Sequence, residues 1–233
     1  IATVALGIGL LAQSIGSICL LTGVNTDGAA KALIGWAIAQ PVLYKQLTNA
    51  EFVAEWQQGR PVVVRGVTRR LKQSWTPTRF ALDYGEMPVE LVDVRTGAEF
   101  TQPLRAFFNG FSRPDLRPRP PSRGRNGAGG AASDISLLKL KDWPTTNDFA
   151  ELLPQHFEDL MQALPLPQYT QRSGRRNLAS YLPHYTLPPD LGPKMYVAYG
   201  SMRGQSGFGT TCLHMDMSDA VNVLVFVEGA SGK

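Results

Sequence analysis

The segment 209–227 reads Gly209-Thr210-Thr211-Cys212-Leu213-His214-Met215-Asp216-Met217-Ser218-Asp219-Ala220-Val221-Asn222-Val223-Leu224-Val225-Phe226-Val227. Side chains two residues apart on a strand point to the same face, so His214 and Asp216 can approach one metal ion together. An imidazole and a carboxylate are two of the three ligands in the facial triad that holds Fe(II) and leaves positions open for a co-substrate and O2. A histidine and an aspartate at this spacing also occur by chance on solvated surfaces, so the flanking residues decide between the two interpretations.

These flanking residues resemble the JmjC-domain histone demethylases, most closely the lysine demethylase 3 group. That group carries a segment similar to G-T-T-x-L-H-x-D-x-S-D-A-x-N-V-x-V-x-V, and nearly every fixed letter of it is present here. Other blocks resemble the same group in the same order, and together they cover residues 50–230 with one insertion. The blocks are residues 59–64, 138–144, 159–161, 165–170, 177–183 and 190–200.

The resemblance implies an α+β, mainly β fold: a double-stranded β-helix of the cupin-like jelly-roll type, surrounded by helices. It implies Fe(II)- and 2-oxoglutarate-dependent demethylation of mono- and dimethylated lysine nine of histone H3, carried out in the nucleus by a chromatin regulator. The expected partners are the histone H3 tail and chromatin, and no membrane. Two other functions stay open: a JmjC hydroxylase that acts on protein side chains, and a catalytically dead module that only binds chromatin.

The resemblance makes His214 and Asp216 the catalytic iron ligands. In this family the second histidine ligand comes from a later strand, after the H-x-D triplet. The sequence holds three histidines, and His156 and His184 both precede the triplet. We expect His156 to be an exposed helix residue and His184 to be no ligand. We also expect the C-terminal part of the domain to lie outside this sequence, and the chain as given to be inactive because the second iron histidine is absent from it.

Three further residues are candidates for binding the co-substrate. Thr211 resembles the threonine that hydrogen-bonds the 2-oxoglutarate carboxylate in JmjC enzymes, although it is also an ordinary β-branched strand residue. Asn222 matches the family's asparagine near the co-substrate, and an amide inside a strand needs a hydrogen-bond partner if it is buried. Lys233 is the only downstream candidate for the lysine that pairs with the far carboxylate, and its spacing departs from the family pattern.

Two tyrosines precede the motif on the adjoining strand. The aromatic rings of Tyr196 and Tyr199 could cage a methylated ammonium group by cation–π attraction, as aromatic residues near this position do in related enzymes. Core packing is an equally good interpretation for either ring.

Composition sets wider limits. The chain has 233 residues, of which 43% are hydrophobic, enough for one sizeable core. The net charge of +4 permits an anionic partner without requiring one. Cys19 and Cys212 form neither a metal motif nor a disulfide framework, which favours a reducing intracellular compartment.

We divide the chain into residues 1–45, an apolar segment of unclear role, and residues 46–233, the N-terminal part of a JmjC domain. Residues 1–24 carry no charge, but polar residues and glycines dilute their hydrophobicity, so a buried helix or a mistranslated stretch is favoured over a membrane span. Residues 112–133 are rich in Pro, Gly and Arg with little apolar bulk, which predicts a disordered insertion. Its arginines could touch nucleic-acid phosphates weakly.

Capping signals and periodicity predict the remaining elements. Helices are expected to start at Asn49, acting as the cap, and at Thr76-Pro77. A short helix is expected over 104–108 and a helical stripe over 149–164 that breaks at Pro154. Strands are expected at 61–64, 89–94, 137–140, 195–199 and 221–227, and residues 165–193 are expected to be irregular.

Overall fold

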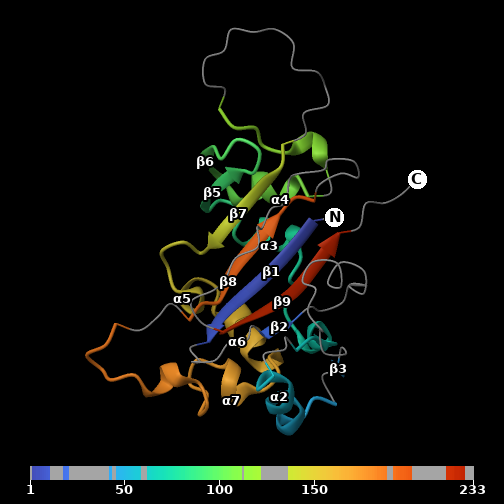
Figure 1. The fold of residues 1–233 in the computed structure, drawn as a ribbon. Helices are drawn as coiled ribbons and strands as arrows, with labels where there is room; N and C mark the ends of the chain where they lie inside the picture. The colour runs from blue at the N-terminus through green and yellow to red at the C-terminus, as the bar shows by residue number, and fades with distance from the viewer. Residues whose placement is uncertain are drawn as a thin grey trace.

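The structure is a computed structural model. It describes residues 2–10, 18–20, 42–43, 46–58, 62–111, 113–121, 136–187, 191–200 and 219–228, with the first three ranges as backbone only. Within these residues the fold combines one large sheet, a second small sheet and several short helices (Figure 1). The expectation of a mixed α+β fold is confirmed.

The large sheet has seven strands in the order β2-β9-β1-β8-β7-β5-β6. All neighbours in it pair antiparallel except β2 and β9, which are parallel. A second sheet pairs β3 with β4 in parallel. The strands are β1 (Ala2–Leu10), β2 (Ile18–Leu20), β3 (Val42–Leu43), β4 (Val64–Arg65), β5 (Pro88–Asp93), β6 (Glu99–Pro103), β7 (Leu138–Trp143), β8 (Lys194–Ala198) and β9 (Asp219–Glu228).

One row of cross-strand partners defines the core face of the sheet. It consists of Phe100 on β6, Leu91 on β5, Leu140 on β7 and Val197 on β8, all buried. Directly paired residues point to the same face, so the whole row looks toward the helices. The same hydrophobic cluster contains aromatic side chains of the helix layer, among them Phe80, Phe107, Phe108 and Phe149.

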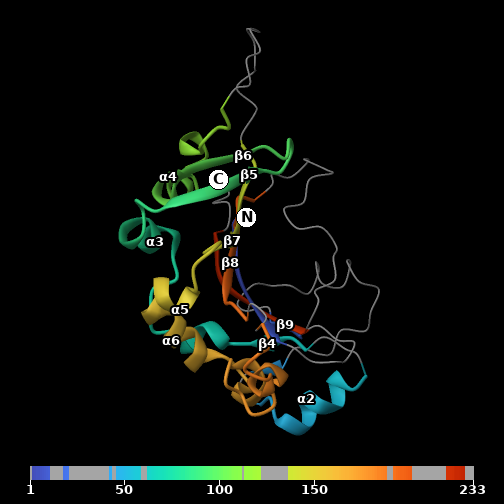
Figure 2. The same cartoon turned by 90° about the vertical axis from the view of Figure 1, so that its left-hand side faces the viewer.

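The helices lie mainly on one side of the sheet. Figure 2 shows the sheet close to edge-on, with α3, α5 and α6 together on one side of it. The helices are α2 (Asn49–Trp56), α3 (Pro77–Asp83), α4 (Leu104–Asn109), α5 (Phe149–Leu152), α6 (Pro154–Ala163) and α7 (Pro167–Thr170). The stretch 165–193, expected to be irregular, also contains a 3-10 helix, Leu178–Tyr181. Within the described ranges, no helix is long and apolar enough to cross a membrane.

Local capping explains where these helices begin. Thr76 accepts a hydrogen bond from the Arg79 N–H and Pro77 takes the first helical position, so the predicted start of α3 is confirmed. The predicted start of α2 is correct, but its cap is Thr48 and not Asn49. The Thr48 hydroxyl accepts from the Glu51 N–H, and the Glu51 carboxylate accepts from the Thr48 N–H, which makes a capping box.

The buried carboxylate of Asp159 on α6 binds the loop that precedes α3. Asp159 is 5% exposed and accepts hydrogen bonds from the backbone N–H groups of Lys72 and Gln73, at 2.8 and 2.9 Å. The indole Nε1 of Trp75 donates a third bond at 2.9 Å. A buried carboxylate is tolerated only when such donors satisfy it, so these three bonds fix the loop onto the helix.

The expectation that His156 is exposed was wrong. Its side chain is 4% exposed, and its ring packs against Trp75 and Phe80 with both centroid distances at 4.9 Å. Apolar and charged positions alternate irregularly along α6, and the polar neighbours of His156 concealed its inward position. Burial lowers the pKa of His156, and the carbonyl of Ser74 opposes this shift as a hydrogen-bond partner.

Two expectations about the N-terminal segment and the insertion need correction. Residues 2–10 form a strand in the middle of the large sheet and not a buried helix. In the predicted disordered insertion, residues 113–121 are described and include a 3-10 helix, Pro114–Leu116. Arg117 is anchored there, because its Nε donates to the carbonyl of Gly110 at 3.1 Å. The rest of the predicted insertion, 122–133, lies outside the described residues, as does 112.

Candidate functional site

The candidate site is built on three strands, β8, β1 and β9. β1 lies between the other two and pairs antiparallel with both, so β8 and β9 run parallel to each other. Figure 1 shows the three strands side by side, β8 in orange, β1 in blue and β9 in red. The segment that carries His214 and Asp216 connects the end of β8 to the start of β9. The two described strands therefore fix where this connection leaves and rejoins the sheet.

Strand alternation separates a core face from an opposite face. On β8, Met195 and Val197 are buried on the core side, while Tyr196 between them is 41% exposed. On β9, Val221 and Val223 are fully buried, and Asn222 between them is only half-buried. Tyr196 and Asn222 therefore both belong to the face that points away from the helix layer.

The register separates Tyr196 and Asn222 on that face by two strands and by two residues along the strand, or about 12 Å. Across β1, Tyr196 is level with Ala5 and Leu224, and Lys194 is level with Gly7 and Asn222. Adjacent strands lie about 4.8 Å apart, so positions two strands apart are separated by about 10 Å. Tyr196 and Asn222 thus stand on one face, two strands apart and one pleat out of line.

Tyr199 lies on the other side of the sheet. It is an odd number of residues from Tyr196, so continued alternation turns it toward the core, where it is 1% exposed. Its hydroxyl donates to the carbonyl of Phe107 at 2.6 Å, and its ring stacks on Phe107 at 4.7 Å. A Cβ at Gly110 would collide with this hydroxyl. Of the two roles that the sequence left open for Tyr199, its surroundings match core packing, and the two tyrosines do not line one pocket.

Arg117 covers the remaining side of Tyr199. Its guanidinium lies 4.2 Å from the centroid of the Tyr199 ring, a cation–π geometry. Burial raises the pKa of the Tyr199 hydroxyl above its ordinary value, and the nearby Arg117 charge only partly offsets this. The phenol therefore stays neutral and acts as a hydrogen-bond donor. Composition alone had assigned Arg117 to a solvated loop.

The predicted iron ligands His214 and Asp216, and the predicted co-substrate residues Thr211 and Lys233, lie outside the described residues. Within the described ranges there is no group of three or more His, Cys, Asp or Glu side chains that could hold a metal ion. His184 is exposed and its ring lies beside Tyr185, whereas His156 is buried in the helix layer. Neither described histidine thus belongs to a cluster that could complete the triad.

Lys194 was missed by the sequence analysis. It shares the register row of Asn222 and the face of Tyr196, and its Nζ donates to the carbonyl of Pro144 at 2.7 Å. Lys194 and Tyr196 are two residues apart on one strand, so the sequence alone could have placed both side chains on the same face. Its proximity to Asn222 could not be foreseen, because the register across β1 involves residues from the opposite end of the chain.

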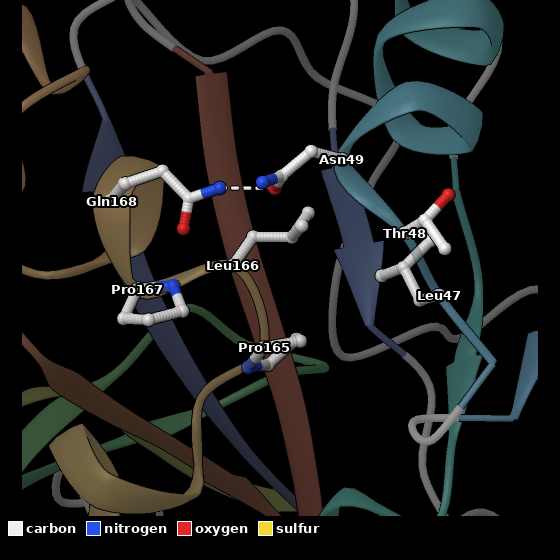
Figure 3. A pocket seen from close by; sticks show the side chains of 7 residues that line it. All are labelled: Leu47, Thr48, Asn49, Pro165, Leu166, Pro167 and Gln168. Carbon is white, nitrogen blue, oxygen red and sulfur yellow. Dashed lines mark hydrogen bonds between the residues drawn. The ribbon is translucent and has the colours of Figure 1, made fainter.

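A separate pocket lies between the start of α2 and the segment that leads into α7. It has a volume of about 440 Å³, and Figure 3 shows Gln168 donating a hydrogen bond to Asn49 across it. No lining residue carries a charge or a metal-binding group, and the nearby Glu51 side chain is already engaged in the capping box at the start of α2. The lining residues are Leu47, Thr48, Asn49, Pro165, Leu166, Pro167 and Gln168. We therefore place the candidate site on the sheet and not in this pocket.

No family model matches the chain. Human lysine-specific demethylase 3A is 45% identical over 175 residues, which are 74% of this chain and 12% of that protein. Lysine-specific demethylase 3 of Drosophila melanogaster is 46% identical over 178 residues, which are 76% of this chain and 20% of that protein. The human probable JmjC domain-containing histone demethylation protein 2C is 37% identical over 192 residues, 81% of this chain and 7% of that protein. The chain thus spans a small part of each relative, and over that part it is a homologue of the lysine-specific demethylase 3 group of JmjC-domain demethylases, as its motifs predicted.

Proposed function

We propose that this chain contributes to an Fe(II)- and 2-oxoglutarate-dependent demethylase that acts on mono- and dimethylated lysine nine of histone H3. The observation that carries the proposal is the 45% identity to lysine-specific demethylase 3A, in a chain that keeps both His214 and Asp216. The overall reaction consumes O2 and 2-oxoglutarate and yields succinate, CO2, formaldehyde and the demethylated amine. One oxygen atom enters succinate and the other leaves in formaldehyde.

The donor chemistry of the H-x-D triplet fits Fe(II). The imidazole of His214 and the carboxylate of Asp216 are ligand types that this ion takes in facial triads, and the third ligand does not come from the described histidines. When bound, the iron and its co-substrate supply the oxidation of the N-methyl group. We therefore propose that residues 1–233 bind iron weakly by themselves and do not turn over substrate.

The remaining residues hold the reactants. We propose that Thr211 and Asn222 hydrogen-bond 2-oxoglutarate and that Lys233 pairs with its far carboxylate. Asn222 is half-buried on the face away from the helix layer, which suits an amide that must meet a polar ligand. Tyr196 on the same face is the proposed contact for the methylated ammonium group, by cation–π attraction. Tyr199 packs on the core side of the sheet, against Phe107, and is not part of the proposed binding face.

The proposed architecture is the double-stranded β-helix of JmjC proteins. The long antiparallel sheet with helices on one side supports it, because such a sheet supplies one wall of a jelly roll. We propose a nuclear location with the histone H3 tail and chromatin as partners, since the curated relatives are by name lysine-specific demethylases and a probable histone demethylation protein. Weak contact of the Arg-rich segment with nucleic acid is part of the same proposal. Hydroxylation of a protein side chain, or chromatin binding without catalysis, are the alternative outcomes.

The test is formaldehyde release from a histone H3 peptide dimethylated at lysine nine, with Fe(II) and 2-oxoglutarate. Two proteins are compared: residues 1–233, and a chimera in which the segment that follows the matched region of human lysine-specific demethylase 3A continues the chain. We expect no product from the first and product from the second, because the chimera gains the later histidine of the family. His214→Ala in the chimera should abolish release.

Mass spectrometry of the same peptide separates the alternatives. A gain of one oxygen atom without loss of a methyl group would favour a hydroxylase. A folded chimera that binds the peptide without altering it would favour the binding module. Formaldehyde release that persists in the His214→Ala chimera would overturn the assignment of the iron ligand.

A further inference from the structure

Residues 178–187, called the exposed segment below, present a cluster of large apolar side chains to solvent. Five of them are between 36% and 92% exposed: Leu178, Tyr181, Leu182, Tyr185 and Leu187. Elsewhere in the described ranges such side chains are isolated, as Leu82, Leu116 and Tyr196 are. Figure 1 shows the exposed segment in orange at the lower left, extending away from the helices. Single exposed leucines are common on proteins, whereas a cluster of this kind marks a site of interaction.

Hydrogen bonds hold the exposed segment in a defined conformation. The amide side chain of Asn177 is buried and donates to the carbonyl of Gln171, while it accepts from the N–H of Ala179, both at 3.1 Å. The hydroxyl of Tyr181 donates to the carbonyl of Arg175 at 2.5 Å and leaves its ring exposed. A surface that is already ordered loses little conformational entropy on binding, so its apolar groups are available to a partner at a low cost.

The ionisable residues around the exposed segment are all basic. Residues 160–189 contain three arginines, one histidine and no aspartate or glutamate. Two of these arginines, Arg175 and Arg176, are exposed at the base of the exposed segment, and Arg176 donates to the hydroxyl of Tyr169 at 2.5 Å. The third arginine pairs with Asp148. A surface of this charge attracts a partner that carries carboxylates and repels a basic one.

The types of the exposed side chains favour a protein over other anionic partners. Nucleic-acid phosphates are bound mainly by cationic and polar groups, so the leucines would gain nothing there. The only helical part is the 3-10 helix Leu178–Tyr181, which is too short to lie as an amphipathic helix in a membrane surface. A second copy of this chain would bring arginines against arginines, because a two-fold contact joins the same patch of both copies. Tyrosine and arginine around apolar groups are the composition of protein interfaces.

We propose that the exposed segment, together with Arg175 and Arg176, is a docking surface for an acidic protein segment that presents apolar side chains. The partner's apolar groups cover Tyr185 and Leu187, the two most exposed side chains of the cluster, and its carboxylates pair with the two arginines. None of the residues proposed for demethylation belongs to this surface, so the inference does not depend on that function.

Binding of designed peptides to the full chain tests the chemistry of the partner. The probe is a fluorescent amphipathic peptide of leucine and glutamate. One matched peptide carries lysine in place of every glutamate, and another carries serine in place of every leucine. We expect fluorescence anisotropy to show about tenfold tighter binding of the leucine–glutamate peptide than of either matched peptide, because both charge and apolar contact are required. Equal binding of either matched peptide would overturn the proposal.

Paired substitutions locate the apolar contact. Tyr185→Ser with Leu187→Ser should weaken binding of the leucine–glutamate peptide about tenfold, because exposed aromatic and apolar anchors carry most of the binding energy of such surfaces. Leu82→Ser with Leu116→Ser is the matched control, since it removes two exposed leucines elsewhere and should leave the affinity unchanged. Circular dichroism checks that all four surface changes leave the fold intact. Equal effects of the two pairs would refute docking at the exposed segment.

The charged contact has its own matched pair. Arg175→Ala should weaken the leucine–glutamate peptide several-fold, and the loss should shrink as salt is added. Arg119→Ala removes the same charge from another exposed position and should have no such effect. If both substitutions weaken binding equally, the attraction comes from the net charge of the chain and the proposal is wrong.

The other classes of partner are tested with the same variants. Single-stranded DNA and anionic phospholipid vesicles are the probes, and sedimentation measures self-association of the chain. We expect Tyr185→Ser with Leu187→Ser to change none of these. A chain that ignores the leucine–glutamate peptide, and loses DNA binding, vesicle binding or self-association in this variant, would show that the exposed segment serves a different partner from the one proposed.

Discussion

The two faces of the large sheet use their polar groups differently. On the helix-covered side, Asp159 receives three donors and the Tyr199 hydroxyl donates to a backbone carbonyl, whereas the buried Nδ1 of His156 has no hydrogen-bond partner among the described residues. On the opposite face, Tyr196 is 41% exposed, and Asn222, two strands away, is half-buried. A satisfied polar group rigidifies a fold, whereas an accessible one can meet a ligand. The difference separates polar groups buried under the helices from polar groups on the more accessible face of the sheet.

The largest expected effect is at Asp159 on the helix-covered face. Asp159→Ala leaves two backbone N–H groups and the Trp75 indole without their acceptor, so we expect the free energy of unfolding to fall by about 3 kcal/mol. Chemical denaturation followed by tryptophan fluorescence measures this. Glu158→Ala is the matched control, because the adjacent Glu158 is exposed and accepts a bond from the side chain of Gln162. Equal losses in both variants would contradict the anchoring role of Asp159.

Removing the hydroxyl group from Tyr199 and from Tyr196 compares the two faces of the sheet directly. Tyr199→Phe removes the donor to the Phe107 carbonyl and should lower the free energy of unfolding by about 1–2 kcal/mol. Tyr196→Phe removes a hydroxyl from an exposed side chain and should change it by less than about 0.5 kcal/mol. Thermal and chemical denaturation of both variants checks the difference. A larger loss at Tyr196 than at Tyr199 would reverse our assignment of the two faces.

His156 makes the helix-covered face sensitive to acid. Burial lowers the pKa of its imidazole from the ordinary value of 6.5, so below pH 6.5 the unfolded chain binds a proton that the native chain resists. Stability from this group is thus complete above pH 6.5 and is lost as the pH falls below it. Asp159 and Asp83 counteract the lowering, and Arg79 adds to it. The difference between the free energies of unfolding at pH 7.5 and pH 5.5 should therefore be smaller for His156→Gln than for the unchanged chain. An equal difference in both proteins would show that other groups cause the pH dependence.

The smallest effect is expected in the Arg-rich segment. Deleting residues 122–133 should leave the thermal midpoint within about 2 °C, because this Pro-, Gly- and Arg-rich stretch has little apolar surface to bury. Arg117→Ala should cost about 1 kcal/mol, because it removes the cation over Tyr199 and the donor to Gly110. Differential scanning calorimetry of both variants measures this. If the deletion proves more harmful than Arg117→Ala, the segment packs against the fold after all.

Sequence by itself determined what depends on near neighbours. The cap at Thr76 with Pro77 and the break of the helical stripe at Pro154 are local features, and the structure has α3 and α6 where they predicted. The family followed from ordered motifs, and the curated relatives confirm it. We considered Tyr196 and Tyr199 together as an aromatic cage and did not apply the period of two, which turns residues three apart on a strand to opposite faces.

Tertiary structure decided what depends on distant partners. The burial of His156 requires Trp75 and Phe80 from another part of the chain, so its polar neighbours on α6 were misleading. The anchoring of Arg117 requires Tyr199, which lies far along the sequence. The insertion of residues 2–10 between β8 and β9 depends on two edges near the opposite end of the chain. Local propensity cannot specify which strands become neighbours, because that choice is made by pairing edges and burying faces across the whole chain.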